Sequence, residues 1–183
     1  STDSHTALST SEENNFFGKS ANSEPSTHRV ETPFMKTEIA TVYEWEIGAS
    51  GLAVVWATEN TRASIFDAME RRETYATTGP RIRLRLFAGW DFAPEDATSP
   101  DFAAIGYARG VPMGGQLAAA PAGAAPHFII SAARGPLDHN LDRIQVIKGW
   151  VDAAGKSHDK IYDVVWSGNR KIGPDGKLPA VGN

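Results

Sequence analysis

The clearest alternation of polar and apolar positions runs from residue 81 to residue 87. Three apolar residues would lie on one side of an extended chain and three arginines on the other: Ile82, Leu84 and Leu86 against Arg81, Arg83 and Arg85. A period of two predicts a half-buried antiparallel strand. The arginine side is a candidate surface for an anionic substrate, with a solvated charged face as the alternative.

A helical period precedes this strand. Residues 59–72 place Ile65, Phe66 and Met69 on one apolar face, and Thr58 or Asn60 is expected to cap the helix at its start. A short strand that closes in a turn is expected over residues 75–80. Residues 38–57 predict a short helix or strand and then a buried segment at residues 52–56, whereas residues 20–37 predict a surface loop.

The remainder of the chain is rich in strand-forming residues. Strands are expected over residues 128–132, 141–151 and 161–166, with turns at Gly155 and at residues 174–176. Residues 88–126, rich in Ala, Gly and Pro, predict a long connection without regular structure. Residues 81–183 therefore predict a mostly antiparallel sheet or sandwich, separated from a more helical N-terminal part near Gly79 and Pro80.

Composition narrows the classes of function. The net charge of −4 gives no basic field for a phosphate backbone, so nucleic acid is not expected as a partner. No apolar run reaches the roughly 18 residues of a membrane helix. The absence of cysteine excludes disulfides and thiolate metal sites, and it fits a cytoplasmic and a periplasmic or secreted protein equally.

The first residues carry the strongest candidate chemistry. Asp3 and His5 are two positions apart, so in a strand the carboxylate and the imidazole would converge on one side. An oxygen and a nitrogen donor together suit Zn, Mn or Fe, although a catalytic zinc usually has three protein ligands. The missing ligands would lie elsewhere. The alternative is a capping Asp beside a surface His.

Other candidates are weaker. P-loop, dinucleotide-binding, nucleophile-elbow and H-E-x-x-H motifs are absent from the sequence. His127, His139 and His158 are expected to be structural or exposed, and His28 is a weak ligand candidate. The five tryptophans would serve as a sugar-stacking platform or, as the more common use, in core packing. They are Trp45, Trp56, Trp90, Trp150 and Trp166.

Several blocks in a fixed order resemble the bacterial domain of unknown function family 3604. They are residues 2–6 (TDSHT), 13–19 (ENNFFGK), 57–62 (ATENTR), 75–81 (YATTGPR), 111–115 (VPMGG) and 140–145 (NLDRIQ). That family is similar to the polymerase-and-histidinol-phosphatase (PHP) metallohydrolases and to the carbaryl-hydrolase-like group among them. An acid often found in the family is replaced here by Gln116.

This resemblance implies an α/β plus β fold. Residues 1–80 would form the last part of a distorted (β/α) metallohydrolase barrel, and residues 81–183 would begin an appended, mostly antiparallel β-sandwich-like domain. The late Asp-x-His of the family would correspond to Asp3 and His5. Most of the metal ligands would lie upstream, so the chain is expected to be a C-terminal fragment of a longer protein, with the upstream half as its partner.

The implied activity is metal-dependent hydrolysis of a small-molecule phosphoester, or of a carboxyl or carbamate ester. Divalent Zn, Mn or Fe would lower the pKa of a bound water to about 7 and so supply hydroxide. Asn14, Asn15 and Arg81 are the candidates for binding the substrate. Two alternatives stay open: a non-catalytic β-rich module that binds a carbohydrate or a partner chain, and a structural fragment that packs against the rest of the barrel.

Overall fold

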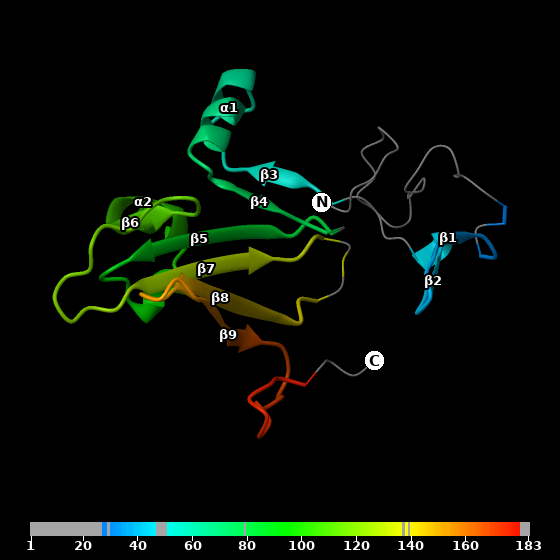
Figure 1. Cartoon of the computed structure of the whole chain (residues 1–183). Coiled ribbons are helices and arrows are strands. Elements are labelled where there is room, and N and C mark those ends of the chain that lie inside the picture. The colour runs from blue at the N-terminus through cyan, green and yellow to red at the C-terminus, as the bar shows by residue number, and fades with distance from the viewer. Residues whose placement is uncertain are drawn as a thin grey trace. The chain divides into compact units, whose positions relative to one another are not determined.

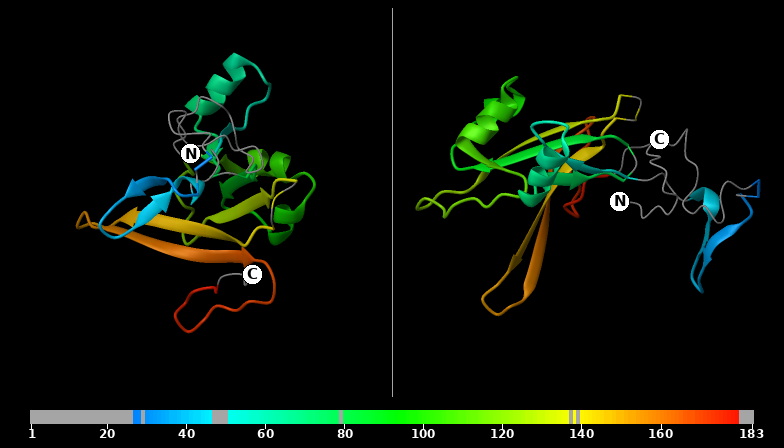
Figure 2. Two further views of the ribbon diagram at one scale, coloured as in Figure 1. Left: turned by 90° about the vertical axis from the view of Figure 1, so that its right-hand side faces the viewer. Right: turned by 90° about the horizontal axis from the view of Figure 1, so that it is seen from above.

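The computed structural model describes residues 27–28, 30–46, 51–78, 80–136, 138 and 140–179. The chain divides into two compact units, Ser1–Ser131 and Ala132–Asn183. The boundary between the two units falls inside the strand at residues 127–133. It differs in position from the break expected between residues 80 and 81, and the domain division at that break stays a prediction. Each unit is described by itself (Figures 1 and 2).

Short strands and two α-helices make up the described part of the first unit (Figure 1). In chain order they are β1 (Pro33–Lys36), β2 (Thr41–Tyr43), the 3-10 helix η2 (Glu44–Glu46), β3 (Ala53–Val55), α1 (Arg62–Glu70), β4 (Thr74–Ala76), β5 (Arg83–Gly89), the 3-10 helix η3 (Pro94–Thr98), α2 (Phe102–Arg109), β6 (Gly110–Pro112) and β7 (His127–Ala133). The strands β8 (Arg143–Val151) and β9 (Ser157–Trp166) belong to the second unit.

The strands form small sheets. Antiparallel pairs join β1 with β2, β3 with β4 and β8 with β9, while β5 lies between β6 and β7 in a sheet of three strands. The chain is therefore β-rich, as the composition predicts. The described residues form no closed barrel, and the metallohydrolase barrel stays a prediction.

The core of the first unit lies where α2 packs against β5 and β6 (Figure 1). Phe87 of β5 is completely buried and clusters with Phe92 and Ile129. The Phe102 ring of α2 meets the Phe87 ring edge to face at 5.6 Å between centroids. Such aromatic pairs contribute about 0.5–1.5 kcal/mol beyond the area they bury.

Helix α2 corrects the prediction that residues 88–126 lack regular structure. Its eight residues include three alanines and Gly106, so they give little apolar periodicity to detect. The glycine is required because a Cβ at position 106 would overlap the Phe87 ring. The helix is therefore held by close packing rather than by intrinsic propensity.

Helix α1 begins later than predicted, and its buried side differs. Thr61 is the N-cap, since its hydroxyl accepts a hydrogen bond from the Ser64 amide, so neither Thr58 nor Asn60 has this role. The expected apolar face is open to solvent, with Phe66 59% and Met69 53% exposed. Ala68 is instead the buried residue of the helix. The apolar periodicity correctly predicted a helix but wrongly predicted which of its sides is buried.

Strand β1 corrects the prediction of a loop over residues 20–37 at its C-terminal end. The strand begins at Pro33, a position where the missing amide proton costs no ladder hydrogen bond. Thr37 and Ala40 close its turn toward β2 through a backbone hydrogen bond of 2.8 Å. The proline content of this segment favoured a loop, although its last residues form a short antiparallel pair with β2.

The strands predicted for residues 128–132, 141–151 and 161–166 are confirmed. Figure 2 shows β8 and β9 as a long two-stranded hairpin, here called the ribbon. Its turn contains Gly155 at a φ of 79°, and the turn at residues 174–176 contains Gly176 at a φ of 73°. Both positions favour glycine, as the turn chemistry predicts. Among the described residues, no helix is long and apolar enough to cross a membrane.

Candidate functional site

Four of the five predicted site residues lie outside the residues that the structure describes. They are Asp3, His5, Asn14 and Asn15. The fifth, Arg81, is an exposed residue between β4 and β5. Among residues 27–28, 30–46 and the described ranges from residue 51 onward, no group of three or more His, Cys, Asp or Glu side chains is placed to hold a metal ion.

A buried carboxylate sits where the segment after α1 meets α2. Glu73 is only 2% exposed. The Tyr107 hydroxyl donates a hydrogen bond to Glu73 Oε1, and the Arg71 guanidinium lies 3.5 Å from Oε2. These contacts compensate the cost of burying the charge. They tie α2 to the strand β4 that follows Glu73.

Arg85 of β5 approaches the same tyrosine from the other side. Its guanidinium donates a 3.1 Å hydrogen bond to the Tyr107 hydroxyl and lies 4.0 Å from the centre of the Trp56 ring. The side chain is half-buried, so the face of three arginines is not uniformly solvated. Residue 87, on the same side of the strand, is the fully buried phenylalanine. The simple two-sided prediction for this strand is therefore corrected at its C-terminal half.

The environment holds the Tyr107 phenol neutral. Burial raises its pKa above 10.0, and the hydrogen bond to Glu73 raises it further, because both disfavour the phenolate. The Arg85 charge acts in the opposite direction with a smaller effect. The Tyr107 hydroxyl donates a hydrogen bond to Glu73 and accepts one from Arg85. It therefore serves to hold elements together rather than to exchange protons.

A second polar cluster involves η3, α2 and the start of β7. The Arg109 guanidinium donates a 2.9 Å hydrogen bond to the buried Asp96 carboxylate, and His127 Nδ1 lies 2.7 Å from the Phe92 carbonyl oxygen. An open hollow of about 320 Å³ lies beside this histidine. Its lining is otherwise apolar and consists of Phe92, Ala93, Pro94, Ala97, Phe128 and Ile129. His127 is thus anchored to the backbone, in agreement with the structural role predicted for it.

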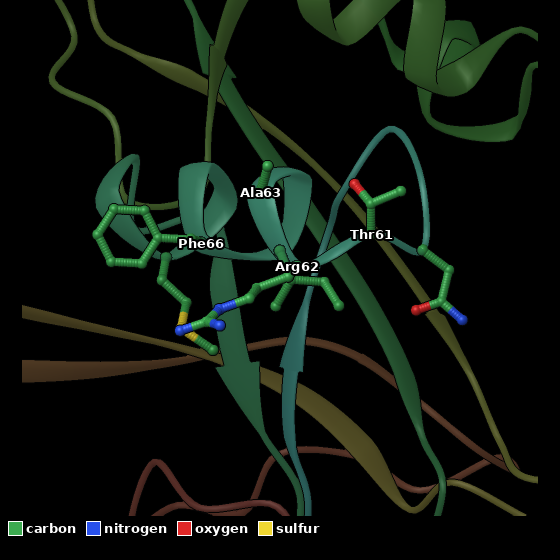
Figure 3. Close-up of a pocket in the computed structure, with 7 residues that line it drawn as sticks. Thr61, Arg62, Ala63 and Phe66 are labelled. Atoms are coloured by element: carbon green, nitrogen blue, oxygen red, sulfur yellow. The ribbon is translucent and has the colours of Figure 1, made fainter.

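The exposed side of α1 borders a larger open hollow of about 930 Å³ (Figure 3). Figure 3 shows Arg62, Ala63 and Phe66 along this helix, with Thr61 at its start. Ile65 and Met69 complete the apolar part of the surface. Among the described residues that line this surface, Arg62 is the only titratable one, so the exposed apolar groups here suit packing better than catalysis.

The ribbon carries a third cluster at its turn. His158 Nε2 lies 2.7 Å from Asp152 Oδ2, and the His158 ring stacks on Trp150 with 5.2 Å between centroids and 16° between planes. The hydrogen bond from His158 lowers the Asp152 pKa below 3.8, with help from the backbone amides of Lys156 and Ala154. The spacing of Asp152 and His158 on either side of the predicted turn at Gly155 was the signal in the sequence for this pair.

Among the described residues, the two tryptophans of the ribbon lie too far apart along it to form one stacking platform. Trp56 stacks with Arg85, whereas in the ribbon Trp150 lies near the turn and Trp166 lies at the opposite end of the strand pair. Trp166 is half-buried and donates a 2.8 Å hydrogen bond to the Arg170 carbonyl. Trp150 is 41% exposed, which leaves it available for an interaction.

Comparison with known proteins gives one family. The family model described as "Protein of unknown function (DUF3604)" matches residues 1–183. Searches of curated proteins and of solved structures found no match. Since the match covers the whole sequence, the chain belongs to the DUF3604 family.

Proposed function

We propose that the chain forms part of a metal-dependent hydrolase that cleaves phosphoesters, or carboxyl or carbamate esters. The observation that supports this proposal is the Asp3-Ser4-His5 motif in a member of DUF3604. The carboxylate and the imidazole are the donor types of Zn, Mn and Fe sites in proteins. Their spacing lets both side chains point to the same side of an extended segment.

The proposed site needs more ligands than this pair. A catalytic zinc usually has three protein ligands, and sites with several metals have more. In line with the resemblance to the PHP metallohydrolases, the other ligands are assigned to the upstream half of the parent protein. The chemistry that such ions supply is the activation of water at neutral pH and the polarisation of the scissile bond.

The chain's own residues would then position the substrate. Arg81 is exposed and lies between β4 and β5, and a guanidinium at such a position suits contact with a phosphoryl or carboxylate oxygen. The amides of Asn14 and Asn15 are assigned the same role because they follow the Asp-x-His motif closely. Their contribution is orientation of the ester, not proton transfer.

The test uses the complete parent protein. Replacing Asp3 or His5 with alanine is expected to remove bound metal, measured by mass spectrometry, and to lower turnover by more than about 100-fold. Asp67→Ala is the matched control because this carboxylate is exposed on α1 and lies outside the motif. Arg81→Gln should raise KM without a loss of metal. Normal metal content and turnover in the Asp3→Ala variant would contradict the proposal.

A second candidate function is a non-catalytic module or structural fragment that binds a carbohydrate or a partner chain. Exposed apolar and aromatic side chains on the ribbon favour it: Ile147 (66%), Trp150 (41%), Val151 (65%), Ile161 (55%) and Tyr162 (41%). An isolated two-stranded hairpin is only marginally stable in water, so such side chains gain from a partner. Retention of the metal-free chain on a glycan array, or on a purified upstream half, would support this function.

A further inference from the structure

The two faces of the ribbon differ in chemistry. Residues directly opposite each other in an antiparallel pair share a face, and the faces alternate along each strand. One face, here called the basic face, carries the pairs Val146↔Tyr162, Lys148↔Lys160 and Trp150↔His158. The other face carries Gln145↔Asp163, Ile147↔Ile161 and Gly149↔Asp159. Aromatic and basic groups are thus separated from the strand carboxylates.

The two lysines of the basic face are oriented by aromatic rings. Lys148 Nζ lies 5.1 Å from the centre of the Trp150 ring, and Lys160 Nζ lies 4.8 Å from the centre of the Tyr162 ring. Both lysines are exposed. Asp163 is engaged by Arg143 and Gln145 on the opposite face, and Asp152 is engaged by His158. Within the described part of the chain, neither ammonium forms an ion pair.

This arrangement costs the ribbon stability. Like charges directly opposite in an antiparallel pair are destabilising. Cation–π contacts at exposed sites return only about 0.5–1 kcal/mol each. An anion between the two ammonium groups would relieve this repulsion.

The aromatic side chains of the basic face favour a ligand that has flat apolar surfaces to pack against them. Trp150 is held in place by the stack on His158, which is itself fixed by Asp152 in the turn. Trp150 and Tyr162 each keep 41% of their surface exposed. From residue 146 to residue 150 the face is about 13 Å long, which suits a short chain of rings better than a single small ion.

Charge counts favour a short anionic chain over nucleic acid. Residues 132–183 hold eight Lys and Arg against six Asp and Glu, a balance of +2, while residues 1–131 hold ten against sixteen, a balance of −6. Two lysines on a narrow face fall short of the six to ten phosphate contacts that are typical of salt-dependent nucleic-acid binding. A ligand that carries only a few carboxylates matches a face with two lysines.

We propose that the basic face of the ribbon binds an anionic carbohydrate chain of the uronic acid class. Its carboxylates pair with Lys148 and Lys160, and the apolar surface of its sugar rings packs against Trp150 and Tyr162. This inference rests on the second candidate function, the binding module, and not on the hydrolase. It names the ligand class and the face that the second candidate leaves unassigned.

Titration calorimetry of the complete chain tests the inference, with an oligosaccharide of galacturonic acid as the probe. We expect saturable binding, which becomes about tenfold weaker for the methyl ester of the same oligosaccharide and for Lys148→Gln/Lys160→Gln. Trp150→Ala should weaken it about fivefold. The control Lys171→Gln/Lys177→Gln changes the charge equally at exposed positions outside the strands and should stay within about twofold.

The other outcomes overturn the inference in distinguishable ways. Equal binding of the methyl ester would leave a binding module but remove the lysines from it. Equal binding of poly-glutamate would mean a surface that reads charge without sugar. Binding only to vesicles that contain phosphatidylserine would mean a membrane surface. No binding of any probe, with metal-dependent turnover intact in the parent protein, would leave the hydrolase proposal standing and refute this one.

Discussion

Gly106 of α2 faces the ring of Phe87 of β5 so closely that a β-carbon on the glycine would overlap the ring. Phe87 is completely buried, so the ring has no room to move aside. The contact fixes how near the helix comes to the central strand of the three-stranded sheet. It also explains why a residue of poor helix propensity stands inside this helix.

Replacing Gly106 with alanine should therefore destabilise the first unit. Although alanine favours the helix by about 1 kcal/mol, the overlap is expected to lower the free energy of unfolding by about 1–3 kcal/mol overall. Urea unfolding followed by circular dichroism measures the change. Ala104→Ser, at an exposed position of the same helix, should stay within about 0.5 kcal/mol. Wild-type stability of Gly106→Ala would mean that the helix is not packed this closely.

The bond between Tyr107 and Glu73 should also stabilise the unit. Tyr107→Phe leaves the buried carboxylate with one donor fewer, which is expected to cost about 1–3 kcal/mol. In Glu73→Gln/Tyr107→Phe the loss should be smaller than the sum of the two single losses, as a double-mutant cycle would show. Additive losses would indicate that the two side chains do not interact.

The pH dependence of stability offers an independent check of Tyr107. Its pKa in the folded chain is raised above 10.0 by burial and by Glu73, so the folded state holds this proton more tightly than the unfolded state does. The stabilisation is complete below pH 10 and is lost as the pH rises from there through the folded pKa. The alkaline loss measured by urea unfolding should therefore be smaller in Tyr107→Phe. An identical loss in both proteins would contradict the assignment.

Strands with a clear pattern could be predicted from the sequence, whereas the packing of helices could not. Residues 141–151 and 161–166 are rich in Val, Ile and Trp, and Gly155 lies between them, so these two strands and a turn are predicted from the sequence. The helix over residues 102–109 was missed because its alanines give little apolar periodicity and because Gly106 packs against Phe87, a contact between distant segments. The exposed face of α1 shows the converse, since apolar spacing is no proof of burial.

The candidate sites divide in a similar way. Asp3 and His5 are recognisable from their spacing and from the family resemblance, and their geometry lies outside the described residues. The basic face of the ribbon depends on register. Lys148 and Lys160 become neighbours only when the turn sets residue 150 opposite residue 158. Charge composition alone, with a net value of −4, hides this local basic surface.

The pair of Asp152 and His158 should hold the end of the ribbon in a way that depends on pH. The Asp152 pKa is lowered below 3.8 by the hydrogen bond from His158, so its stabilisation is present above that pH and is lost as the pH falls through the folded pKa. The indole NMR signal of Trp150 should shift over this acid range as the stack on His158 loosens. In Asp152→Asn the acid shift should be absent; its persistence there would exclude this pair as the cause.

The repulsion between Lys148 and Lys160 predicts a substitution that stabilises the chain. Lys160→Glu places opposite charges directly across the strands and should raise the stability of the ribbon by about 0.2–1 kcal/mol. Hydrogen exchange of the β8 and β9 amides measures this local change. High salt should reduce the gain, because both side chains are exposed and their interaction is screened.

The matched change Lys177→Glu, outside the strand pair, should leave the exchange of these amides unaltered. If Lys160→Glu slows exchange and also abolishes binding of the acidic oligosaccharide, the lysine pair serves the ligand at the expense of the fold; no gain in protection would mean that the two ammonium groups do not repel each other across the strands.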